Sequence, residues 1–225
     1  MSQIASRADP SGAGRSRKPS VPDVRPPRRL LSPGTERALT TRQLEILDTL
    51  DESVLSGGFA DLTMAEIARR MTCSLRTLYG IAPSKEELVL AVVDRRLHRI
   101  GREAMEALEL DGPPLERLRA YLRATNLALQ PTTVLFSRDF AKLPGALQLA
   151  EAHAGYIVSV TRALLDEAVA SGAIAPLDTS ALALVLGRLG REFARPELES
   201  LIEESPRETA DAIAEIILAG LVAGR

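Results

Sequence analysis

Aromatic residues, cysteine and histidine are scarce in this chain. Phe and Tyr make up 3% of the 225 residues and Trp is absent, which argues against a platform that stacks single-stranded bases. The single cysteine, Cys73, rules out an intrachain disulfide and favours a cytoplasmic location. The two histidines, His98 and His153, leave little material for catalysis or metal binding.

Motifs typical of enzymes and metal proteins are missing as well. The chain has no Gly-Lys-Ser/Thr phosphate loop, no Gly-x-Ser-x-Gly nucleophile motif and no cluster at metal-ligand spacing. We therefore predict that the protein is not an enzyme and needs no cofactor or metal ion. A pairing of His153 with an aspartate or glutamate is the one catalytic arrangement that the sequence leaves open.

Long hydrophobic runs are also missing, although 45% of the residues are hydrophobic. The longest candidates, Ala181–Gly187 and Ile216–Gly224, are much shorter than the roughly 18 residues of a transmembrane helix. No basic segment followed by an apolar one opens the chain, so we expect neither a signal peptide nor a membrane partner. The length suits one large domain or two small ones around a buried core.

The formal net charge of −2 conceals an uneven distribution. Residues 1–37 hold eight basic and three acidic residues together with six prolines, which predicts a disordered basic arm. Residues 38–100 carry a net charge of −1, and residues 101–225 carry −6. The arm is either a solvated extension or a segment that contacts an anionic backbone.

Helix signals run through the rest of the chain, whereas strand signals are scarce. Three pairs have the spacing of a capping box, in which two side chains cap one helix reciprocally: Thr40 with Gln43, Thr63 with Glu66, and Ser84 with Glu87. Apolar periodicity and Gly or Pro breaks predict helices near 40–57, 63–71, 74–79, 84–102, 115–129, 145–171, 179–194 and 206–222. We therefore expect an all-α fold.

Residues 63–79 form the most informative segment. A helix, a three-residue turn at Thr72–Ser74 and a second short helix have the pattern of a helix-turn-helix. Leu75 and Leu78 are expected to fill the wedge between the two helices. The opposite face of the second helix would then be free to enter the major groove of DNA.

This pattern resembles the TetR family of bacterial transcriptional regulators over about residues 40–100. The matching residues are Thr63, Ile67-Ala68, Ser74, Thr77-Leu78-Tyr79 and Ser84-Lys85-Glu86-Glu87-Leu88. The resemblance implies a three-helix, helix-turn-helix DNA-binding domain at residues 38–90. It also implies a helical ligand-binding and dimerisation domain at residues 91–225.

Three positions depart from the family pattern. Thr72 stands where the turn usually has glycine, and that position often requires a positive φ, which a β-branched residue adopts poorly. Gly80-Ile81 replaces a pair that is commonly polar or basic, and Ala82 replaces an aromatic residue. We expect these changes to affect DNA affinity and sequence choice rather than the order of the helices.

Side-chain chemistry and the resemblance together predict a DNA interface. Arg76 is a candidate for bidentate recognition of guanine or for a phosphate contact, and Thr63 for a phosphate contact or a cap alone. Tyr79 is either a phosphate contact or a packing residue. The full set is Arg42, Thr63, Ser74, Leu75, Arg76, Thr77, Tyr79 and Lys85, with Arg28 and Arg29 as further candidates from the arm.

Two apolar patterns, at 179–194 and 206–222, predict a homodimer in which two helices from each subunit meet. Ala183, Gly187 and Gly190 form a strip of small residues on the first of them. The alternative for both helices is an ordinary place in the core. A two-fold dimer would hold its recognition helices about 34 Å apart and read a near-palindromic operator in double-stranded DNA.

A pocket for a small apolar or amphipathic effector is expected between helices near 100–165. The candidate lining residues are Tyr121, Asn126, Phe136, Phe140, His153 and Tyr156. The resemblance implies that the effector shifts helix 84–102 and changes the separation of the recognition helices. The predicted function is a ligand-responsive repressor, and the alternative is a protein-interaction module with a degenerate DNA-binding head.

Overall fold

All regular structure in the described part of the chain is helical, as the sequence predicts. A computed structural model describes residues 23–109, 112–128, 133–193, 195–198 and 201–223. Its α-helices are α1 (Pro33–Ala38), α2 (Thr41–Gly57), α3 (Met64–Arg70), α4 (Leu75–Tyr79), α5 (Lys85–Glu106), α6 (Pro114–Ala128), α7 (Val134–Ala141), α8 (Ala146–Ala170), α9 (Thr179–Leu186), α10 (Leu189–Phe193) and α11 (Pro206–Ala223). Within these ranges, no helix is both long and apolar enough to cross a membrane.

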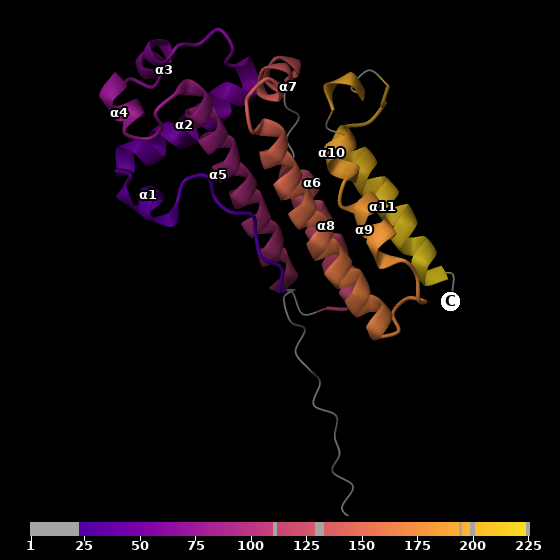
Figure 1. Ribbon diagram of the computed structural model, residues 1–225. Helices are drawn as coiled ribbons and strands as arrows, with labels where there is room; N and C mark the ends of the chain where they lie inside the picture. Colours follow the sequence, from indigo (N-terminus) through magenta and orange to yellow (C-terminus); the bar gives the residue numbers. More distant parts are fainter. Residues whose placement is uncertain (1–22, 110–111, 129–132, 194, 199–200, 224–225) are drawn as a thin grey trace, which may run out of the picture.

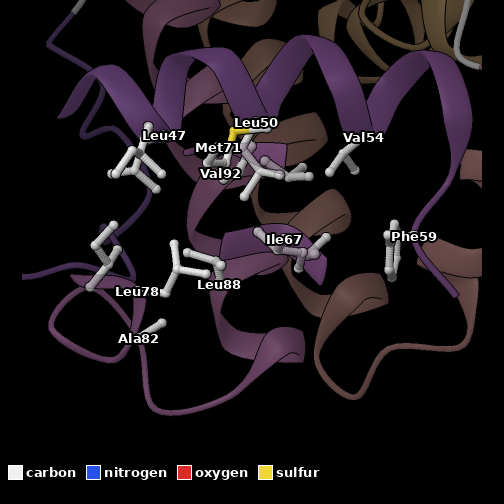
Figure 2. Close-up of a cluster of buried hydrophobic side chains, with 14 of the residues drawn as sticks. Leu47, Leu50, Val54, Phe59, Ile67, Met71, Leu78, Ala82, Leu88 and Val92 are labelled. Atoms are coloured by element: carbon white, nitrogen blue, oxygen red, sulfur yellow. The ribbon is translucent and has the colours of Figure 1, made fainter. Parts of the chain in front are cut away.

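Helices α1 to α4 and the first half of α5 form a small domain, the head, on one side of the molecule (Figure 1). Short hydroxyl-capped helices build it: Thr40 and Thr63 complete capping boxes, while Ser74 and Ser84 cap α4 and α5. Each cap supplies a partner for a backbone amide that the helix itself leaves unpaired. The core between the helices includes Leu47, Leu50, Val54, Ile67, Leu78, Leu88 and Val92 (Figure 2).

The remaining helices form a second domain, the body, in which α5, α6 and α8 pack together and α9 to α11 lie on the outer side (Figure 1). Its core contains Leu118, Tyr121, Leu164, Leu165 and Leu218. Helix α5 belongs to both domains, since Leu88 lies in the head core and Ala104 in the body core. A displacement of α5 would therefore change the packing of both cores.

The prediction of one continuous helix over residues 179–194 is wrong. The segment is divided into α9 and α10, and Gly187 caps the first. A Cβ on Gly187 would lie 3.1 Å from the Cα of Val158 on α8. Ala183 and Gly190 are buried as well, so the strip of small residues lets helices approach one another within the chain.

The prediction of a disordered arm through residue 37 is corrected for residues 23–37; residues 1–22 lie outside the described part. Residues 33–38 form α1, capped by Ser32. The stretch before α1 is held against α5, where the Leu30 amide donates to Asp94 Oδ2 at 2.9 Å. Glu36 pairs with Arg29 and with Arg95. Contacts with residues about 60 positions later order this stretch, and local composition does not reveal them.

Candidate nucleic-acid interface

The turn between α3 and α4 has the geometry of a Schellman motif. The Cys73 amide donates to the Ala68 carbonyl at 2.9 Å, and the Thr72 amide donates to Arg69 at 3.2 Å. Thr72 has φ = 51°, the left-handed conformation that glycine usually occupies in this motif. The expectation of a strained position is confirmed, because a β-branched side chain is disfavoured there. Cys73 is half-buried against the head core, and burial raises the pKa of its thiol.

Helix α4 buries one side chain and exposes its neighbours. Leu78 is fully buried, whereas Leu75 is 42% exposed and Tyr79 is 54% exposed. The expectation that Leu75 fills the wedge between α3 and α4 is therefore wrong. Leu78 occupies the centre of the contact, and Leu75, three residues earlier, lies about 60° away around the helix axis, at the edge of the buried face. Arg76 is exposed, and Thr77 is half-buried with its hydroxyl 2.8 Å from that of Ser74.

The surface around α4 is locally cationic. Arg69, Arg70 and Arg76 are exposed, and Glu66 is the one acidic residue between Thr63 and Gly80. Glu66 is engaged with Thr63: its carboxylate accepts from the Thr63 amide at 2.7 Å and from the hydroxyl at 2.8 Å. These hydrogen bonds lower the pKa of the Glu66 carboxyl, so it stays ionised at the N-terminus of α3.

Two basic residues of the predicted DNA interface, Arg42 and Lys85, already have partners inside the head. Arg42 Nη2 donates to the Met71 carbonyl at 3.0 Å, and its Nη1 pairs with Glu45. Lys85 Nζ donates to the Ala60 carbonyl at 2.8 Å. Both cations thus position the helix-turn-helix in the free protein.

Gln43 is predicted only as a helix cap, but it also positions α4. Its side-chain oxygen caps α2, while Nε2 donates to the Thr77 carbonyl at 3.2 Å and so fastens the end of α4 to α2. A Cβ on Gly80 would lie 2.8 Å from this nitrogen. The departure at Gly80 therefore makes room for Gln43. Ala82 is buried in the head core (Figure 2).

The loop between α2 and α3 connects the head to the body. Asp139 on α7 accepts hydrogen bonds from the amides of Phe59 and Ala60 at 3.0 and 2.9 Å. Burial raises the pKa of Asp139, but these two donors outweigh it and the pKa lies below its usual value. Phe136 and Phe140 stack on one another beside Phe59. These contacts join α7 of the body to the loop between α2 and α3 of the head.

The predicted effector residues separate into two groups. His153 and Tyr156 line a cavity of about 1090 Å³ between residues 24–33, α5 and α8. Tyr121 is fully buried in the body core, which raises the pKa of its hydroxyl, and Asn126 donates to Asp211 at 2.7 Å. Phe136 and Phe140 belong to the head core. The other four predicted residues therefore lie away from this cavity.

The cavity has an apolar and a cationic side. Apolar side chains come from α5 and α8 and include Leu90, Leu97, Met105 and Leu149, while Arg25, Arg28, Arg29 and Arg102 supply positive charge. His98 and His153 also line it, and His153 Nε2 lies 3.2 Å from Asp94 Oδ1. The pairing of His153 with an acid is thus present. Burial lowers the pKa of His98, although Asp94 acts in the opposite direction.

A capped helix-turn-helix with an exposed second helix, followed by a helical body, defines the class of helix-turn-helix transcriptional regulators. Residues 46–92 match the family model described as bacterial regulatory proteins, tetR family. Over this segment, which holds the helix-turn-helix, the chain is similar to the TetR family of transcriptional regulators. The resemblance predicted from Thr63, Ile67-Ala68 and Thr77-Leu78-Tyr79 is therefore confirmed for residues 46–92.

Relatives and solved structures agree with this assignment. The transcriptional repressor KstR of Mycolicibacterium smegmatis is 30% identical over 94 residues, covering 42% of this chain and 46% of KstR. KstR of Mycobacterium tuberculosis is 27% identical over 123 residues, covering 52% and 56%. The chain thus spans about half the length of these relatives.

The fold likeness extends further than the sequence likeness. A TetR regulator from Haloarcula marismortui has a TM-score of 0.64 at 18% identity and covers 80% of this chain and 97% of that one. The regulator PfmR from Thermus thermophilus has a TM-score of 0.59 at 21% identity, covering 78% and 98%. At such identities the likeness concerns the fold.

Proposed function

We propose that this protein is a dimeric repressor that binds a near-palindromic operator through α4 and releases it when an amphipathic effector occupies the body. The observation that carries the proposal is the exposed face of α4, where Leu75, Arg76 and Tyr79 project from a capped helix-turn-helix. A guanidinium at this place can bind guanine with two hydrogen bonds, and an apolar side chain suits a thymine methyl. A cytoplasmic location, where the chromosome lies, is part of the proposal.

Phosphate contacts would fix the position of α4 in the groove. Arg69 and Arg70 add positive charge beside Arg76, and the N-termini of helices favour phosphates. In the complex, Arg42 and Lys85 would bind DNA phosphates, either in place of their carbonyl partners or in addition to them. The net charge of −6 over residues 101–225 would disfavour contact between the body and the duplex.

Exposed apolar side chains on α9 and α11 support the dimer. Leu184 and Val185 project from α9, and Ile216 and Val222 project from α11. Helix α9 contains no charged residue, and in α11 the charged residues lie in the N-terminal part, with none after Glu215. Apolar faces of this kind mark contacts with another protein, and a second copy would cover them by two-fold symmetry.

The composition of the cavity supports an effector that joins an apolar tail to an anionic group. Such a ligand would contact Leu97 and Met105 with its tail and the arginines of residues 25–29 with its charge. Since α5 lines the cavity and also enters the head core, a ligand that prefers one position of α5 would change the spacing of the two α4 helices.

Binding to DNA with and without Arg76 tests the proposal. The Arg76→Ala change should weaken binding to the preferred sequence by about 1–3 kcal/mol and relax the choice at one base position, as measured by fluorescence anisotropy. Arg162→Ala, which removes an exposed arginine from α8, is the matched control and should leave affinity unchanged.

Two other results would revise the proposal. An equal loss of affinity on all sequences would make Arg76 a phosphate contact. A wild-type protein that binds no fragment at low salt would contradict DNA binding and favour the protein-interaction module.

A further inference from the structure

Asp94, His98 and His153 form a compact buried cluster where α5 meets α8. Asp94 and His98 are four residues apart and share one face of α5, while His153 comes from α8. Asp94 Oδ1 lies 3.2 Å from His153 Nε2 and 3.4 Å from His98 Nε2. The three side chains are only 5–8% exposed. The fold thus brings His153 of α8 to Asp94 and His98 of α5, although 59 positions separate His153 from Asp94 in the sequence.

The hydrogen bonds of this cluster are incomplete in one respect. Asp94 Oδ2 accepts from the Leu30 amide at 2.9 Å, and Oδ1 faces both imidazoles. His153 Nε2 is within hydrogen-bond distance of Oδ1. His98 Nε2 is buried and makes no hydrogen bond to any residue in the described ranges. Leaving a buried polar atom without a hydrogen bond is unfavourable, so a ligand that bound this nitrogen would stabilise the folded protein.

We propose that Asp94, His98 and His153 bind a divalent transition-metal ion of the Zn²⁺ type. Zinc bonds of about 2.0–2.1 Å in a tetrahedral site put neighbouring ligand atoms about 3.3 Å apart, close to the two distances observed. The three ligand atoms all lie within 4.8 Å of one another, so small side-chain rotations close the site. The ion would give His98 Nε2 the partner that it lacks.

The ligand set determines which ions fit. Two imidazoles and one carboxylate suit Zn²⁺, Co²⁺, Ni²⁺ or Fe²⁺, whereas Mg²⁺ and Ca²⁺ prefer ligand sets made only of oxygen. Three protein ligands leave a coordination position open, and both histidines line the cavity between residues 24–33, α5 and α8. Water or an anionic group in the cavity can therefore complete the coordination.

The supporting contacts connect the site to the rest of the fold. The Leu30 amide fixes the second oxygen of Asp94, as outer hydrogen bonds do for metal-binding carboxylates. A bound ion would therefore fasten α5, α8 and the segment before α1 to one another. Metal binding is measured on the free protein, so its outcome is independent of whether DNA binding through α4 is correct.

Titration with Co²⁺, followed by visible absorption, tests the site. The protein must carry no histidine tag, because His98 and His153 are the only two histidines in the chain. We expect one Co²⁺ per chain, displaced by one equivalent of Zn²⁺ and unaffected by excess Mg²⁺. His153→Ala and Asp94→Asn should each weaken binding by more than the roughly 10–100-fold loss typical of removing a supporting contact. Cys73→Ser removes the one thiol, which lies in the head, and should bind like the wild type.

A second readout uses the unaltered protein and avoids variants that fail to fold. In a ¹H–¹⁵N spectrum of the imidazole rings, the signals of both histidines should shift together at one equivalent of Zn²⁺. Binding that changes neither histidine signal, or that survives in His153→Ala, would overturn the proposal. So would the absence of any binding of Zn²⁺ or Co²⁺ at about 0.1 mM metal ion.

Discussion

The head and the body differ in what they leave on their surfaces. On α2 to α4 of the head, the large apolar side chains that remain exposed are Leu75 and Tyr79, both on α4. The outer helices of the body expose four apolar side chains, Leu184 and Val185 on α9 and Ile216 and Val222 on α11. Under the proposed function, the head presents cations and two apolar side chains to a groove of DNA, and the body presents an apolar face to a second copy of the chain.

The two domains also differ in their interiors. In the head, Gln43 and Lys85 hydrogen-bond to backbone carbonyls, and buried apolar side chains form the core. The body holds a cavity of about 1090 Å³ beside a buried histidine cluster. Under the proposed function, this cavity is the part of the molecule that an effector would occupy.

The largest effect is expected in the head core. Leu78→Ala should lower the free energy of unfolding by about 2–5 kcal/mol, because Leu78 is fully buried and its removal leaves a cavity. Leu75→Ala, on the same helix, should cost less than about 1 kcal/mol. Urea denaturation followed by circular dichroism measures both. Equal losses would show that the two faces of α4 are not distinct.

Self-association is the next test, and it concerns the body. Ile216→Asp should weaken the dimer by about 2–4 kcal/mol, since it places a charge in an apolar contact twice per dimer. Leu147→Asp on α8 is the matched control, because Leu147 is 72% exposed and Ile216 is 71% exposed. Sedimentation equilibrium should find the control unchanged. If both variants stay dimeric, α11 is not at the interface.

The connection between the domains is tested at Asp139. Asp139→Ala should cost about 1–3 kcal/mol, because the buried amide of Phe59 and the amide of Ala60 lose their acceptor. The folded-state pKa of Asp139 is lowered, so its contribution is present above about pH 3.9 and is lost as the pH falls through the folded-state value.

Thermal unfolding of wild type and Asp139→Ala from pH 7 to pH 2 measures this contribution. The difference in stability should shrink at the acid end. A difference that stays constant with pH would mean that the ionised carboxylate is not what holds the loop.

The smallest effect is expected at the strained turn. Thr72→Gly should stabilise the head by about 1 kcal/mol by relieving the left-handed conformation, which raises Tm by about 2–4 °C. Thr72→Val keeps the β-branched side chain and should bring no gain. A lower Tm for the glycine variant would show that the flexibility of glycine in the unfolded chain outweighs the strain.

The head was predictable from the sequence because its signals are local. Thr40, Thr63 and Ser74 are followed three residues later by their capping partners, and the need for a positive φ at Thr72 follows from the turn pattern. The exposure of Leu75 was not predictable in this way. It depends on which of two apolar residues meets α3 at the centre of the contact.

The body was predictable only in outline because its sites depend on tertiary contacts. Tyr121 and Phe136 are aromatic like Tyr156, yet their helices turn them into the core and away from the cavity. The spacing of Asp94 and His98 is visible in the sequence, but His153 joins them only when α8 packs on α5. The close approach of Gly187 to the backbone of Val158 likewise appears only in the folded chain.

Selection of bound DNA from a random pool tests the central claim most directly, namely that a dimer presents two α4 helices to adjacent major grooves. We predict enrichment of a near-palindrome whose half-site centres lie about one helical turn, roughly 34 Å, apart or a multiple of that distance. With Arg76→Ala, the base preference should disappear at one position of each half-site and be retained at the other positions. Recovery of unrelated sequences, or of a single half-site without symmetry, would contradict the claim.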